Sequence, residues 1–150
     1  MGTAGEAAAG PGPALAVGLS ATVQAVVTEA DTAAAVGSGD VPVLSTPRLL
    51  ALAEAATVGA VAPYLGAGMT SVGTSVSLEH RRASPAGTEV VVEAELTEVA
   101  GRRLVFSFIA RDAGVPAADG GEHAVIGAGT VERVVVDRQA FLERARPPAG

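Results

Sequence analysis

One carboxylate interrupts an otherwise small and aliphatic stretch of the sequence. Between Ser45 and Leu65 the chain reads STPRLLALAEAATVGAVAPYL, in which Glu54 is the single acidic residue. If this stretch forms a core helix, the carboxylate needs a partner or a chemical role, because burying an unpaired charge is costly. A glutamate in such a place can orient a histidine and stabilise its imidazolium, which leaves the second ring nitrogen free to act as a base.

Two further residues have side chains suited to the same chemistry. His80 ends a strand-like segment and titrates near neutral pH. Thr46 stands at the expected start of the helix, where free backbone N–H groups in a positive local field could hold an oxyanion. A base, an orienting acid, an oxyanion site and a hydroxyl form the kind of set that acyl transfer requires. Gly73, which has no side chain, could offer its backbone N–H to a carbonyl that approaches closely.

Each candidate also has a simpler interpretation. His80 could be a histidine at the core edge, satisfied by a backbone carbonyl. Glu54 could pair with Arg48 or with an arginine from elsewhere, and Thr46 could serve only as the helix N-cap. His123 is expected at the surface. The residue types alone therefore leave both interpretations open.

A helix over residues 46–62 is expected to carry two of these groups. Pro47 suits the first helical position, since its missing N–H would be unpaired there, and this makes Thr46 the expected N-cap. Two adjacent stripes at helical spacing are mostly apolar, so other structure should pack around the helix. The stripes consist of Leu49, Leu52, Ala53, Ala56 and Ala60, and of Leu50, Glu54, Thr57 and Val61.

The rest of the chain shows the period of two that is typical of strands. Strand-like segments are residues 19–31, 70–82, 88–99, 104–112 and 123–136, with a connection over 32–44, a hairpin turn at 100–103, a loop at 114–122 and a terminal helix at 137–146. Strict alternation in 70–82 places Val72, Thr74, Val76, Leu78 and His80 on one face, and Ser71 and Gly73 on the other. In 88–99 and 104–112 the inward residues are Val90, Val92, Ala94, Leu96, Leu104, Phe106 and Phe108. Successive hairpins predict an antiparallel five-stranded sheet, and one helix against such a sheet gives an α+β fold.

Composition limits the possible functions. The chain of 150 residues is 49% hydrophobic, which suits one folded domain, expected over residues 14–146 with a disordered tail at 1–13 and a frayed end at 147–150. A net charge of −6 gives no electrostatic reason to expect nucleic-acid binding. No cysteine is present, so neither a disulfide nor a thiolate site can form. No membrane span or secretory signal is expected, and a cytoplasmic location follows as the default.

Several dispersed blocks give the chain a family resemblance from about residue 41 onwards. The blocks are ST before the helix, E within it, APYL at its end, GT and H on the next strand, SPAGTEVVVEAEL, VAGRRLVF, IGAGTVERVVV and PPAG. With these blocks in register, the chain resembles the fluoroacetyl-CoA thioesterase family of hot-dog fold proteins. The resemblance implies a sheet wrapped around the helix, a homodimer with sites at the subunit interface, and hydrolysis of a short acyl-CoA thioester without a metal or redox cofactor.

The same resemblance assigns roles to the candidate residues. It implies that Thr46, Glu54 and His80 are catalytic and that Gly73 contacts the thioester carbonyl. His80 would be the base that activates water or takes a proton from the acyl group. Glu54 would orient His80 or attack directly, and Thr46 would hydrogen-bond to the thioester or attack it, so that the nucleophile is left open.

One departure from the family concerns the segment before Thr46. Here GSGDVPVLST contains no aromatic residue, whereas the family member selective for the fluorinated substrate has an aromatic lid there. Because such a lid selects shape and excludes water, fluoroacetyl selectivity is not expected, and another acyl-CoA or a carrier-bound acyl group is. Two alternatives remain: another hot-dog enzyme such as an enoyl-CoA hydratase, which would need an Asp and a His near the helix, and a non-catalytic module that binds acyl-CoA or another small ligand.

Overall fold

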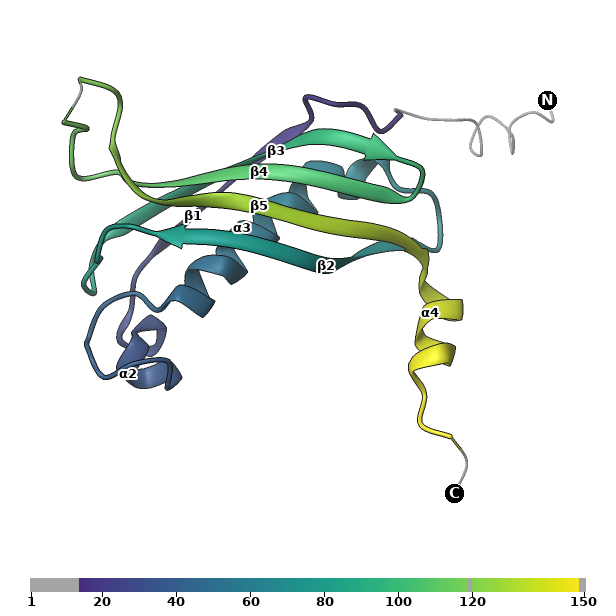
Figure 1. Ribbon diagram of the computed structural model, residues 1–150, viewed down its shortest axis with the longest axis horizontal. Coiled ribbons are helices and arrows are strands. Elements are labelled where there is room, and N and C mark those ends of the chain that lie inside the picture. Colours follow the sequence, from purple (N-terminus) through teal and green to yellow (C-terminus); the bar gives the residue numbers. More distant parts are fainter. Residues whose placement is uncertain (1–13, 119, 149–150) are drawn as a thin grey trace.

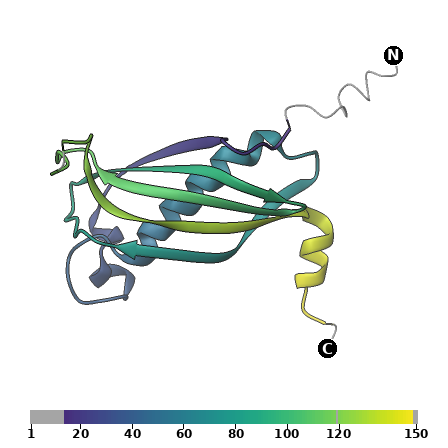
Figure 2. The same ribbon diagram turned by 45° about the horizontal axis from the view of Figure 1, so that its top comes forward.

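The computed structural model describes residues 14–118 and 120–148, which form one antiparallel sheet curved around a long helix (Figure 1). The strands are β1 (Ser20–Val26), β2 (Met69–His80), β3 (Glu89–Ala100), β4 (Arg103–Asp112) and β5 (Ala124–Asp137). The helices are α2 (Ala33–Val36), α3 (Thr46–Val61) and α4 (Arg138–Ala145), with 3-10 turns η1 (Glu29–Asp31) and η2 (Ala62–Tyr64). The predicted α+β, hot-dog arrangement of five antiparallel strands around the helix is confirmed. The turned view shows α3 lying along the concave face of the sheet (Figure 2).

The domain limits can be compared with the structure only in part. The predicted tail at 1–13, and residues 149 and 150 of the predicted frayed end 147–150, lie outside the described residues. The single domain at 14–146 therefore stays a prediction, although every helix and strand of the described chain lies inside it.

The strand order corrects one expectation about connectivity. The order in the sheet is β1-β3-β4-β5-β2, so β2 pairs with β5 and not with β3, its successor in the chain. Residues 81–88 therefore cross from one side of the sheet to the other and do not make a hairpin turn. The predicted hairpin between β3 and β4 is present, with Gly101 at a φ of 61°. One consequence is that β2 forms an edge of the sheet.

A bulge in β2 overturns the predicted alternation of its side chains. The pairing with β5 runs in register to Gly73↔Arg133 and resumes at Ser75↔Glu132, so Thr74 has no partner opposite it. One extra residue reverses the face on which every later side chain lies. Gly73 and His80, which strict alternation places on opposite faces, therefore both face α3.

The core lies between α3 and the central strands. All the predicted inward residues of β3 and β4 are buried, and so is the first apolar stripe of α3. The glycines of β5 are close-approach sites, because a side chain at Gly127 would meet the Glu79 carbonyl at 2.7 Å. In the single chain the helix is covered on one side, whereas Val58 on its opposite side is 41% exposed.

The N-cap of α3 and the end of β1 differ from the predicted ones. Helix α3 begins at Thr46, and its N-cap is Ser45, whose Oγ accepts a hydrogen bond of 3.1 Å from the N–H of Arg48. The prediction of Thr46 as N-cap is wrong by one residue, because the buried Ser45 has the extended backbone that capping requires. Strand β1 is shorter than predicted, since η1 occupies the end of residues 19–31. The predicted connection over 32–44 contains the short helix α2.

Candidate active site

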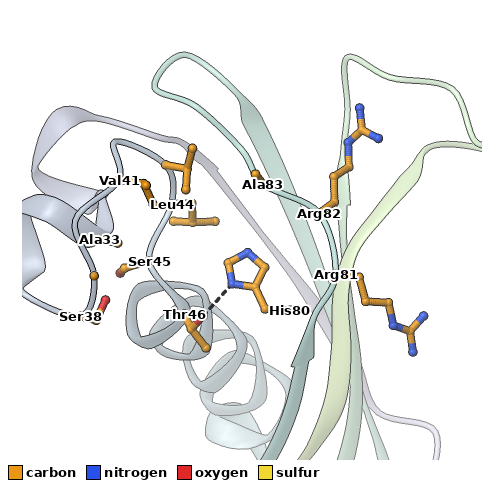
Figure 3. A pocket seen from close by; sticks show the side chains of 12 residues that line it. Ala33, Ser38, Val41, Leu44, Ser45, Thr46, His80, Arg81, Arg82 and Ala83 are labelled. Atoms are coloured by element: carbon orange, nitrogen blue, oxygen red, sulfur yellow. Dashed lines mark hydrogen bonds between the residues drawn. The ribbon is translucent and has the colours of Figure 1, made fainter.

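Thr46 and His80 meet where the start of α3 lies beside the end of β2 (Figure 3). Thr46 Oγ1 and His80 Nδ1 share a hydrogen bond of 2.8 Å. The contact depends on the cap, since Ser45 occupies the capping position and leaves the Thr46 hydroxyl free to reach the ring. The N–H groups of Arg81 and Arg82 both donate to the Ile126 carbonyl, which fixes the backbone that follows His80. Two of the four sequence-predicted site residues are thus brought together.

The second ring nitrogen of His80 is in an unusual position. Nε2 is buried and has no hydrogen-bond partner among the described residues. Buried polar atoms are nearly always paired, so this one calls for an explanation. Burial lowers the pKa of His80 below its ordinary value. The nearby backbone of Arg82 has the smaller, opposite effect of raising this pKa. The net lowering favours the neutral imidazole, which is the form that a general base needs.

A cavity of about 330 Å³ lies beside this pair. Its wall is mainly small and aliphatic, and includes Val41, Val43 and Leu44 from the segment before α3. The backbone of residues 81–83 forms the opposite rim, and the side chains of Arg81 and Arg82 point away from the imidazole (Figure 3). An uncharged group of modest size fits such a cavity better than an anion.

Glu54 does not join the Thr46–His80 pair within the chain. It lies eight residues beyond Thr46 on the same helix, which is about 12 Å at the α-helical rise per residue. Its Oε2 is 3.4 Å from Nη1 of Arg133, and its side chain is 37% exposed. The suggested alternative partner Arg48 instead pairs with Asp31, at 2.9 Å between Nε and Oδ1.

Gly73 lies directly against Glu54. A Cβ added at Gly73 would collide with Oε2 of Glu54 and would come within 3.5 Å of Nη1 of Arg133. The absence of a side chain therefore makes room for the carboxylate. The sequence analysis suggested another role for Gly73, that its backbone N–H binds the substrate carbonyl. This role is compatible with making room for the carboxylate.

Arg133 is the arginine from elsewhere that the sequence analysis allowed as a partner of Glu54 but did not name. It is 6% exposed, and its guanidinium donates from Nε to Ser71 Oγ at 2.8 Å and from Nη2 to the Ser71 carbonyl at 3.0 Å. Burial lowers the pKa of Arg133, and Glu54 raises it. A signal for it exists in the sequence, since Arg133 alternates with Val131 and Val135 on the inward face of β5.

Two observations bear on other kinds of site. Within the described ranges 14–118 and 120–148, no three His, Cys, Asp or Glu residues gather closely enough to hold a metal ion. No described helix is both long and apolar enough to cross a membrane.

Comparisons with known proteins give the class and the family. Residues 27–139 match the family described as fluoroacetyl-CoA-specific thioesterase, FlK. The fluoroacetyl-CoA thioesterase of Streptantibioticus cattleyicolor is 41% identical over 110 residues, covering 72% of this chain and 73% of that protein. A solved structure of the fluoroacetyl-CoA thioesterase FlK has a TM-score of 0.78 at 33% identity, covering 91% of this chain and 100% of that one. A Thermus thermophilus hypothetical protein of the thioesterase superfamily has a TM-score of 0.75 at 25% identity. The match covers 87% of this chain and 92% of that protein's chain.

The fold and these similarities define a hot-dog thioesterase, an enzyme that hydrolyses thioesters. More narrowly, the chain belongs to the fluoroacetyl-CoA-specific thioesterase family. The predicted family resemblance is thereby confirmed.

Proposed function

We propose that the protein hydrolyses a short-chain acyl-CoA thioester at a site that Thr46, Glu54, His80 and Gly73 form across a dimer interface. The observation that carries this proposal is the Thr46–His80 hydrogen bond, with a buried and unpartnered Nε2 beside an aliphatic cavity. A neutral imidazole, oriented through one ring nitrogen and free at the other, is the arrangement of a general base.

The position of β2 supports a site shared between two subunits. The strand has 12 residues and, among the described strands, pairs with β5 alone. A long open edge is a surface on which a second strand adds. His80 lies at one end of the strand and Gly73, with Glu54 over it, lies in the other half. In a two-fold antiparallel pairing of β2 with its copy, the His80 end of one subunit lies beside the Gly73 half of the partner.

The reaction in such a site can be described by following the transferred proton. With Nδ1–H donating to the Thr46 hydroxyl, His80 Nε2 accepts a proton from water as the oxygen adds to the thioester carbonyl. The tetrahedral intermediate collapses with cleavage of the C–S bond, and the imidazolium returns the proton to the leaving thiolate. The backbone N–H groups of Gly73 and Thr46 are the candidate donors to the oxyanion, because Pro47 has no N–H and the N–H groups of Arg48 and Leu49 already bond to Ser45. A second route, in which Glu54 or Thr46 attacks first, uses the same groups.

The acyl group that we propose is small and uncharged, without selection for fluorine. Residues 37–46 contain no aromatic side chain, and Val41 at the cavity is 49% exposed. A lining of this kind does not close tightly over a fluorinated two-carbon acyl group or exclude water from it. The thiol carrier is either coenzyme A or an acyl carrier protein, and a cytoplasmic location suits both.

Release of free thiol from a panel of acyl-CoAs tests the proposal. We expect turnover of at least one short acyl-CoA, with kcat lowered by about 10²–10⁴ in the variants Glu54→Gln and His80→Ala. His123→Ala removes the chain's other histidine and Glu79→Gln removes an exposed acid of β2, and both should retain activity. Binding of acyl-CoA without turnover would contradict the proposal in favour of a non-catalytic binding module. Hydration of crotonyl-CoA with its thioester intact would contradict it in favour of a hydratase.

A further inference from the structure

Arg82 lies at the junction of two cavities. It lines the cavity of about 330 Å³ beside the Thr46–His80 pair, and it also lines a second cavity of about 410 Å³. The second cavity lies against the loop that joins β4 to β5. Its other lining residues are Pro116, Ala117, Ala118, Ala124 and Val125. Because both cavities border the same side chain, an elongated ligand that leaves the first cavity over Arg82 can enter the second.

The side chain of Arg82 has no partner in the described part of the chain. Its neighbour Arg81 donates from Nη2 to Glu79 Oε1 at 3.0 Å, so the charge of Arg81 is already paired. Arg82 makes no side-chain hydrogen bond or ion pair with any described residue, although its backbone N–H donates to the Ile126 carbonyl at 3.1 Å. The side chain extends away from the imidazole of His80 (Figure 3). Arg82 is therefore a cation on a fixed backbone whose hydrogen-bond donors are unused.

The wall of the second cavity suits the base and phosphates of a nucleotide. Apart from Arg82 its lining is alanine, proline and valine, so no carboxylate among the described residues there repels an anion. Small apolar side chains leave a smooth surface for a purine ring, and a guanidinium binds phosphate oxygens through two parallel hydrogen bonds. By contrast, Arg111 donates from Nη1 to the His123 carbonyl at 2.9 Å, and it lines a different cavity together with Glu93 and Glu122.

The order of these features matches the chemical order of an acyl-CoA. One end of that molecule, the acyl group with its pantetheine arm, is uncharged, and the other end is an adenosine that bears phosphates. The aliphatic cavity beside His80 suits the first end, and Arg82 with the second cavity suits the other. An acyl carrier protein presents the same pantetheine arm without the adenosine, so it would leave the second cavity unused.

We propose that Arg82 and the cavity between it and residues 116–118 bind the phosphates and adenosine of coenzyme A, which makes coenzyme A the thiol carrier of the substrate. This inference rests on the proposed function, because the acyl group is taken to lie beside His80. Arg82 contributes to substrate binding and not to the chemical step, since its side chain is directed away from the imidazole. A free cation at the mouth of the site also attracts an anionic substrate to a chain whose net charge is −6.

Kinetics with two substrates that carry the same acyl group test the role of Arg82. Acyl-pantetheine has the thioester and arm of acyl-CoA but no nucleotide. Arg82→Gln should lower kcat/KM for acyl-CoA by about 5–20-fold through KM, the effect of losing a charged hydrogen bond near the surface, and should leave kcat/KM for acyl-pantetheine within about 2-fold. An equal loss for both substrates, or no loss for acyl-CoA, would overturn the proposal.

Arg102→Gln is the matched control for this variant. Arg102 is also exposed, but it lies in the hairpin between β3 and β4, at the other end of the sheet from the loop that joins β4 to β5 (Figure 1). The substitution removes the same charge from the chain, so kcat/KM should stay within about 2-fold for both substrates. A loss for acyl-CoA equal to that of Arg82→Gln would mean that net charge alone matters, which would overturn the subsite.

A charge in the cavity wall tests the second cavity independently of Arg82. Ala118→Asp places a carboxylate beside the expected phosphates, and Ala118→Asn places a neutral side chain of the same size there. Ala118 is exposed, so both variants should fold. The Asp variant should raise KM for acyl-CoA by about 3–10-fold and the Asn variant by less than about 2-fold, with acyl-pantetheine unaffected by either. Equal KM values for the two variants would contradict phosphate binding in this cavity.

The same acyl group on an acyl carrier protein distinguishes the two thiol carriers. We expect kcat/KM to be at least about 10-fold higher for acyl-CoA, because only acyl-CoA gains binding energy from the second cavity. An equal or higher kcat/KM for the loaded carrier protein would overturn the assignment of coenzyme A.

Binding of free coenzyme A tells failure of this inference apart from failure of the proposed function. If the wild-type chain hydrolyses no thioester in the panel, the proposed function fails. Calorimetry with free coenzyme A, which has the nucleotide but no thioester, still tests the subsite. Binding that Arg82→Gln weakens by about 5-fold or more would support the subsite. Absence of binding, or equal binding by the wild type and the variant, would overturn it.

Discussion

The two halves of β2 hold two different kinds of chemistry. At its end, His80 is neutral, half-buried and bonded to an uncharged hydroxyl, with one ring nitrogen unpartnered among the described residues. In its other half, Glu54 lies above Gly73 beside the buried cation Arg133. The first environment favours an uncharged base, and the second favours a fixed carboxylate.

If the proposed function holds, neither half is a complete site. Among the described residues, the Thr46–His80 pair has a cavity and a base but no hydrogen bond to a carboxylate, whereas Glu54 has Arg133 as a partner but no histidine. Because both halves lie along the same open edge, one chain offers them in opposite order to a second copy of itself. Two-fold pairing of β2 would then produce two equivalent sites, each with one half from either subunit.

The largest expected effect comes from preventing this pairing. Val76 lies near the middle of β2 and is 45% exposed. Val76→Asp places two carboxylates close together in a two-fold pair, so we expect a folded monomer with kcat/KM reduced by about 100-fold or more. Sedimentation velocity and thiol release measure the two effects.

A matched control exists at the opposite edge of the sheet. Val26 on β1 is 56% exposed, and Val26→Asp should leave both the dimer and the activity intact. An active Val76→Asp monomer would show that each chain contains a whole site.

A smaller effect is expected from adding a methyl group next to Glu54. Gly73→Ala forces the carboxylate away from its position, and we expect kcat to fall by about 10–100-fold with little change in the unfolding midpoint. Gly66→Ala is the control, because its Cβ would meet only Met69 Cγ, at 3.7 Å, in an ordinary contact. If Gly73→Ala and Gly66→Ala were equally active, close packing of Gly73 against Glu54 would have no catalytic role.

The pH dependence should be the mildest effect. Burial lowers the pKa of His80 below its usual 6.5, so kcat/KM should stay level from pH 8 down to about 6.5 and fall below the lowered pKa. Between pH 6.5 and that lowered pKa, His80 binds a proton in the unfolded chain but not in the folded chain. Stability should therefore decrease as the pH falls through this window and then level off.

Urea midpoints of the wild type and of His80→Gln from pH 7.5 to 5 measure this contribution. The difference between the two midpoints should change with pH, in the direction that disfavours the wild type at low pH. A pH-independent difference would mean that His80 keeps its ordinary pKa when folded.

The fold could be predicted from the sequence because the main signals, which are the hydrophobic periods of the strands and of the helix, are local. Alternation in β3 and β4 and the apolar stripe of α3 follow from hydrophobic periodicity, and the structure buries the residues that they predict. The bulge at Thr74 could not be foreseen in this way, since one unpaired residue depends on the register with β5. The pairing of β2 with β5 is likewise non-local, so expecting hairpins throughout gave the wrong strand neighbour.

The candidate site could be predicted from the sequence only in part, because residue types are visible there but non-local packing is not. Thr46 and His80 were selected as chemically competent residues, and the structure joins them by a hydrogen bond. The cap at Ser45 was missed, and Arg133 was not named as the partner of Glu54. Both depend on which of two neighbouring side chains turns inward, and that is decided by packing and not by residue type.

Activity of a mixed dimer measures most directly whether Glu54 and His80 meet across two subunits. Glu54→Gln and His80→Ala chains should each have little activity alone, but a dimer containing one of each would keep one site with both groups intact. After equal mixing and subunit exchange, half of the dimers are mixed, so about a quarter of the wild-type activity should return. No recovery, in a sample where mass spectrometry shows that mixed dimers have formed, would contradict the shared site.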